Sequence, residues 1–191
     1  MRSLGASVLA GAIGGLVVGG LGGRLFMFVL ARMNPEEHGR DTDDGFEMGQ
    51  FTVSGTLNLL VVTTVIGIIG GLVYLVLRDL RFGPAWFRWI SLPVGATVAV
   101  GSMLVHSDGI DFRVLDPQWL AVTLTLAVPF LFTVVVAALG DRWLGPDAVI
   151  RWPNALAWTL RAACVVVLGV FLADLVDTLR ELDDNPFQFP A

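Results

Sequence analysis

Residues 7–26 read SVLAGAIGGLVVGGLGGRLF, and this stretch decides the fold class. Small residues stand four apart in it, at Ser7, Gly11, Gly15, Gly19 and Gly23. Inside a water-exposed helix each glycine costs about 1 kcal/mol relative to alanine, so such a row is poorly suited to a soluble helix. In a bilayer, small residues allow two helices to approach until their backbones touch. The stretch therefore predicts a transmembrane helix with a close-packed face, a glycine zipper.

The composition of the whole chain also indicates a membrane protein. Of the 191 residues, 55% are hydrophobic and only 15% are charged, with a mean hydropathy of +0.74, whereas soluble domains carry about a quarter charged residues. Residues 48–77 and 119–140 contain no Asp, Glu, Lys, Arg or His, and about 20 apolar residues are enough to cross a bilayer as a helix. A transmembrane β-barrel needs alternating segments of about 10 residues, which these runs lack.

We therefore expect an all-α membrane protein, a single domain over residues 1–191 built as a bundle of five transmembrane helices. The expected spans are residues 4–33, 53–77, 89–106, 119–140 and 155–179, and residues 34–52 form an acidic outer loop. The first helix is glycine-rich and close-packed, and Gly67 and Gly71 on the second span are its expected contact. A seam between copies of the chain is the alternative use of the glycine row.

The arginines set the expected orientation, because cytoplasmic loops carry an excess of basic residues. With the N-terminus in the cytoplasm and the C-terminus outside, six arginines lie inside and four outside. Tryptophan favours the headgroup level, and five of the six tryptophans fall at the inner ends of spans. We expect a plasma membrane protein in this orientation. The inner arginines are Arg2, Arg78, Arg81, Arg88, Arg142 and Arg151, and the outer ones are Arg32, Arg40, Arg113 and Arg180.

Three charged residues inside the spans predict an ion pair. At about 1.5 Å per residue, Arg24 lies about 30 Å along the first helix, and Asp174 lies about 24 Å along the fifth, counted from Trp158 at the inner interface. Asp177 follows one turn later on the same face. Opposite charges at one depth predict that the first and fifth helices are adjacent, with Arg24 bridging one or both carboxylates. The alternative is that each charge reaches the outer headgroups on its own.

The sequence contains no residue pattern typical of catalysis, of a cofactor or of a metal site. His38 and His106 stand apart, whereas metalloenzymes need a cluster such as H-E-x-x-H. The acidic outer loop misses the EF-hand spacing, because Gly45 falls at position 5 when Asp41 is position 1. We expect no enzyme, no cofactor and no metal. A net charge of −5 without basic clusters also argues against a nucleic-acid partner.

Two segments carry a family resemblance. TDDGFEMGQFTVSGTL (residues 42–57) and HSDGIDFRVLDPQWLAV (residues 106–122), together with the glycine-rich first span followed by Arg24, resemble a group of small multi-pass integral membrane proteins of high-GC Gram-positive bacteria. The resemblance covers residues 11 to about 143. It implies a helical membrane fold in the plasma membrane and no particular activity.

Three functions fit these observations. The first is a scaffold or accessory subunit without catalytic machinery, with the lipid bilayer and a partner membrane protein or a second copy of the chain as its contacts. The second is a small transporter or channel that uses the intramembrane charges. The third is an outward-facing module that binds a ligand or cation through the acidic outer loop.

Overall fold

The structure is a computed structural model of the chain, and it describes residues 2–39, 49–50, 52–107, 112, 114–144 and 152–184. These residues form helices joined by short connections, and no strand occurs among them. Five of the helices are long and apolar enough to cross a membrane. The expected all-helical class and the number of candidate spans are therefore confirmed.

The first span is one continuous helix of three parts: α1 (Arg2–Gly14), a π-helical stretch η1 (Gly15–Gly22) and α2 (Gly23–Met33). After the short 3-10 turn η2 (Pro35–Glu37), the second span is α3 (Val53–Leu77), extended by the 3-10 turn η3 (Arg78–Leu80). The remaining spans are α4 (Ala85–Leu104), α6 (Gln118–Trp143) and α7 (Asn154–Asp184).

The helix ends differ from the expected spans mainly in α4 and α7. Helix α4 begins at Ala85 directly after Pro84, four residues before the expected start, and α7 continues five residues beyond the expected end. Hydropathy marks the part of a helix that lies in hydrocarbon, whereas the hydrogen-bonded backbone continues into the headgroup region. The expected bounds are therefore too short wherever charged residues extend a span.

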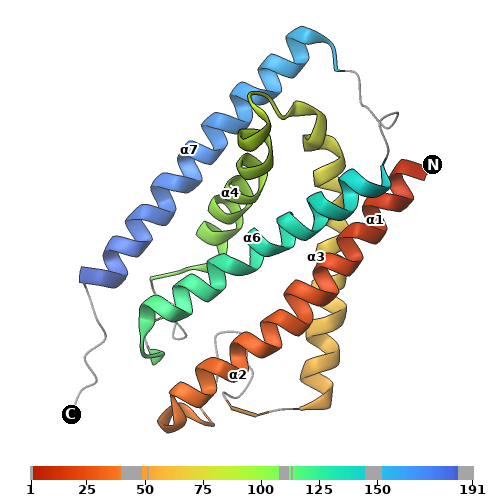
Figure 1. Cartoon of the computed structure of the whole chain (residues 1–191). Coiled ribbons are helices and arrows are strands. Elements are labelled where there is room, and N and C mark those ends of the chain that lie inside the picture. The colour runs from red at the N-terminus through yellow and green to blue at the C-terminus, as the bar shows by residue number, and fades with distance from the viewer. Residues whose placement is uncertain are drawn as a thin grey trace.

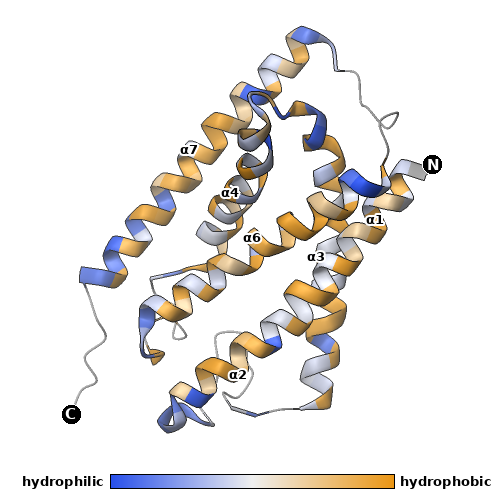
Figure 2. Cartoon of the chain, in the orientation of Figure 1, coloured by the Kyte–Doolittle hydropathy of each residue, from blue (hydrophilic) through white to orange (hydrophobic). Residues whose placement is uncertain are grey.

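Successive spans run in alternating directions (Figure 1). The start of α1, η3, the start of α4, the end of α6 and the start of α7 gather at one end of the bundle, called here the η3 end. The last turn of α7 lies at the opposite end, together with the end of α2 and the start of α3. Figure 2 shows apolar helix centres and hydrophilic residues at the helix ends, as five membrane crossings require.

Packing divides the bundle into two groups of helices. Helix α1 and η1 pack against α3, and α1 also contacts α6, while α4 packs between α6 and α7. Helix α6 is the most central span, with 39% of its apolar window buried, and α7 is the most peripheral, with 6%. In the described part of the chain, the main neighbours of α7 are α4 and η3. One side of α7 therefore faces away from the bundle.

Candidate functional site

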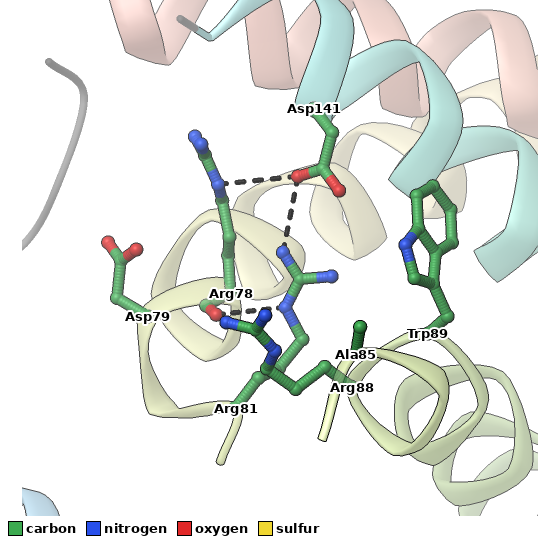
Figure 3. A pocket seen from close by; sticks show the side chains of 7 residues that line it. All are labelled: Arg78, Asp79, Arg81, Ala85, Arg88, Trp89 and Asp141. Atoms are coloured by element: carbon green, nitrogen blue, oxygen red, sulfur yellow. Dashed lines mark hydrogen bonds and ion pairs between the residues drawn. The ribbon is translucent and has the colours of Figure 1, made fainter. Parts of the chain in front are cut away.

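Three donors lie around one carboxylate oxygen of Asp141, near the end of α6, and Figure 3 shows the two that come from Arg78 and Arg81. The hydroxyl of Tyr74 donates to Asp141 Oδ1 at 2.6 Å, and Nη2 of Arg81 donates to the same oxygen at 3.2 Å. Nε of Arg78 lies 3.4 Å from it. Both arginine side chains are only 13% exposed. Hydrogen bonds to an ionised carboxylate are stronger than hydrogen bonds between neutral groups. This cluster therefore stabilises the packing of α3 and η3 against α6.

Helical spacing explains how these groups meet. Tyr74 and Arg78 are one turn apart on a single helix face, and η3 then carries the chain around so that Nε of Arg81 donates to the carbonyl oxygen of Arg78 at 3.0 Å. The guanidinium of Arg81 also lies 5.8 Å from the centre of the Tyr74 ring. Gly140 makes room for this ring, because a methyl group there would lie 2.5 Å from a ring carbon.

A pocket of about 410 Å³ opens beside this cluster at the η3 end. Its wall includes Arg88 and Trp89 from the start of α4, and Arg88 forms no ion pair within the described part of the chain. Three arginines and two aspartates line the pocket. The pocket is lined by Arg78, Asp79, Arg81, Ala85, Arg88, Trp89 and Asp141.

The glycine row of the first span lies against α3. A methyl group added to Gly11 would overlap the carbonyl oxygen of Gly67, and one added to Gly71 would overlap the carbonyl oxygen of Ser7. Ser7 itself is fully buried. At Gly15, an added methyl group would overlap the carbonyl oxygen of Thr63. The structure thus brings backbone against backbone along these residues, within one copy of the chain.

The face of the first span that contacts α3 differs from the expected glycine face at the π-helical stretch and at Gly23. In an α-helix, residues four apart advance around the axis by about 40° per step, whereas the wider i→i+5 turn rotates Gly19 back toward α3. A methyl group on Gly19 would accordingly lie 2.9 Å from Cβ of Thr63. At Gly23 the nearest atom is a Leu59 methyl carbon at 3.8 Å, an ordinary contact. The close approach therefore ends before Gly23.

The structure does not bring Arg24 together with Asp174 or Asp177. Arg24 lies on α2, on the far side of the bundle from α7, and α7 packs against α4 and η3 (Figure 1). Both aspartates are exposed, and the ion-pair partner of Asp177 is Arg180 at 3.5 Å, one turn away on the same helix. The predicted adjacency of the first and fifth spans is wrong, because equal depth does not specify which helices are neighbours.

The outward face of α7 carries a regularly spaced row of side chains, most of them small. Six exposed positions are separated by four, three, four, three and four residues, which is the heptad spacing of a helix–helix seam. Larger side chains are exposed beside this row, among them Trp158, Val165, Val170 and Leu172, while Leu175 and Ala157 are buried toward the bundle. We call the exposed row the α7 seam; it consists of Ala155, Thr159, Ala162, Val166, Gly169 and Ala173. Asp174 and Asp177 lie at its C-terminal end.

The cation-binding hypothesis depends on the acidic outer loop, which was expected over residues 34–52. Residues 40–48 of the acidic outer loop lie outside the described residues, so the structure does not place most of its carboxylates. In the described remainder of the chain, no group of three or more His, Cys, Asp or Glu side chains could hold a metal ion.

The sequence alone did not predict the Asp141 cluster. Two sequence features could have indicated it. A single carboxylate, Asp141, directly follows the uncharged run 119–140, and the basic segment RDLR follows the second span at the same expected end of the membrane. Neither a protein-family model, nor a curated protein, nor a solved structure matches the chain.

Proposed function

We propose that the chain is a non-catalytic integral membrane protein that serves as a scaffold or accessory subunit and docks a partner transmembrane helix on the α7 seam. Its site is the plasma membrane, with the N-terminus in the cytoplasm and the C-terminus outside, as the arginine distribution favours. The glycine row is not available for docking, because α3 already covers it. The exposed seam of α7 is the observation that carries the proposal.

The distribution of side-chain sizes on α7 favours a protein neighbour over lipid. Helix pairs in membranes associate through small residues that permit close van der Waals packing. On α7 a regular row of mostly small residues lies on the exposed side, among larger exposed side chains such as Val165 and Val170, and lipid contact alone would not require such a row. Gly169 has no atom of the protein within 4 Å of the position of an added methyl group. The seam is thus open to a second helix.

Charge favours a partner of different sequence over a second copy of the chain. In a membrane, two copies related by a twofold axis along the bilayer normal would pair their α7 helices in parallel. Asp174 of one copy would then approach Asp174 of the other, which is unfavourable in a medium of low dielectric constant. A partner helix with a Lys or Arg at this depth would instead neutralise Asp174, whereas Asp177 already pairs with Arg180.

A channel or transporter has less support from the same residues. The buried threonines in the middle of α6 donate back to their own helix, Thr125 to the carbonyl oxygen of Ala121 at 2.9 Å and Thr133 to that of Pro129 at 2.8 Å. Their hydroxyl donors are therefore already used, and a continuous polar path finds no support in the described residues of α6.

Co-purification of the tagged full chain in mild detergent, followed by mass spectrometry, tests the proposal. We expect capture of a protein with a basic residue in a transmembrane helix, and we expect Ala162→Leu, Ala173→Leu and Asp174→Asn to abolish it. Ala138→Leu is the matched control, because Ala138 is an exposed alanine on α6. Isolation of a lone monomer, capture of only a second copy, or equal capture by the seam variants and the control would refute the proposal.

A further inference from the structure

Three guanidinium groups and two carboxylates line the pocket at the η3 end. Arg78 and Arg81 share a single oxygen of Asp141, although both side chains are largely removed from solvent. Arg88 adds a third guanidinium to the same wall, and it forms no ion pair among the described residues. An anion in the pocket would neutralise the charge of Arg88.

The identity of the donors indicates which anion fits. Arginine presents a planar fork of donors that matches phosphate and carboxylate oxygens. Ala85, at the first position of α4, also lines the pocket, and no side chain caps this helix end, so that its free amide groups add to the attraction for an anion. A volume of about 410 Å³ lies within the range typical of small-molecule sites, large enough for a phosphate with its substituents.

The position of the pocket relates it to the membrane surface. Trp89 lines the pocket, and Trp86 and Trp143 stand at the same ends of α4 and α6, where aromatic rings mark the headgroup level. An apolar hollow of about 270 Å³ on the last turns of α3, lined by Leu72, Val73, Val76 and Leu77, directly precedes Arg78 in the chain. Basic pockets between transmembrane helices at the membrane surface are typical sites for anionic lipid headgroups.

From these observations we infer that the pocket formed by η3 and the ends of α4 and α6 binds a phosphate group. Arg88 donates to the phosphate from the start of α4, while Arg78 and Arg81 are held in position by Asp141 and supply the positive field behind it. An anionic phospholipid and a soluble phosphate share this chemistry, and the interfacial position favours the phospholipid. The site is independent of the docking seam on α7.

Thermal unfolding of the purified full chain in neutral detergent tests the site with three probes: phosphatidylglycerol, phosphatidylcholine and inorganic phosphate. We expect phosphatidylglycerol to raise the melting temperature more than phosphatidylcholine does. Arg88→Gln should weaken this response by about tenfold in the lipid concentration required, the loss expected for one charge-assisted contact. Arg142→Gln is the matched control, since Arg142 lies on α6 at the same end but outside the pocket, and it should retain the response.

The outcomes distinguish a lipid phosphate from a soluble phosphate, and they also show whether the site exists. Stabilisation by inorganic phosphate that Arg88→Gln also abolishes would support the site with a soluble ligand. An equal response of the native chain and Arg88→Gln to every probe, or an equal loss in Arg142→Gln, would overturn it. The melting temperature without any probe serves as the folding check, and we expect Arg88→Gln to leave it unchanged because Arg88 forms no ion pair in the described part of the chain.

Discussion

Gly11→Ala is the sharpest test of how the first span packs. The added methyl group would overlap the carbonyl oxygen of Gly67 and would lie 3.0 Å from Cα of Gly71. Both obstacles are backbone atoms, so no side chain can rotate away to relieve the clash. Helices α1 and α3 must therefore separate locally, and they lose contacts along the whole row.

The size of the effect follows from a matched pair of variants. In any helix, alanine in place of glycine gains up to about 1 kcal/mol from the backbone. Gly5 is the control, because it lies in α1 with no atom within 4 Å of an added methyl group. The propensity gain cancels between Gly11→Ala and Gly5→Ala, which leaves the overpacking cost of about 1–3 kcal/mol. At about 2–4 °C per kcal/mol for a chain of this size, Gly11→Ala should melt about 2–12 °C below Gly5→Ala.

Thermal unfolding of the full chain in mild detergent, followed by tryptophan fluorescence, measures this difference. Gly71→Ala should behave like Gly11→Ala, since its methyl group would overlap the carbonyl oxygen of Ser7. Gly23→Ala should behave like the control, because its nearest neighbour lies at 3.8 Å. If Gly11→Ala and Gly71→Ala melt as high as Gly5→Ala, the backbone contact between α1 and α3 does not exist.

Three further predictions address the charges and the orientation. Tyr74→Phe removes the donor 2.6 Å from Asp141 and should lower the free energy of unfolding by about 1.5–3 kcal/mol, the range for hydrogen bonds to charged groups; unchanged unfolding in detergent would contradict the cluster. The double variant Arg24→Asp with Asp174→Arg should be no more stable than the sum of the single variants, because α2 and α7 are not neighbours; restored expression and stability would show that they are. Reporter fusions after Asp43 and after Pro84 should report the outside and the cytoplasm, respectively, and the reverse pattern would invert the orientation.

The sequence was sufficient to predict the properties of single helices, namely their helical class and the candidate spans. The absence of charge over residues 48–77 and 119–140 and the length of each apolar run predicted an all-α bundle with five candidate spans. The bounds of α3 agree with the expected residues, since its uncharged run ends at Arg78. These properties depend on transferring one segment at a time from water to lipid, and composition alone decides that transfer.

Which helices are neighbours, and which of their faces meet, was decided only by the tertiary structure. The positions of Arg24 and Asp174 gave equal depths but not which spans are neighbours, and the structure instead assigns Asp141 as the partner of Arg78 and Arg81. Likewise, the glycine spacing predicted a close face but not that a π-helical turn rotates Gly19 onto Thr63 while Gly23 leaves it. Depth along a helix follows from counting residues, whereas neighbours and rotation about the helix axis follow from packing all the spans at once.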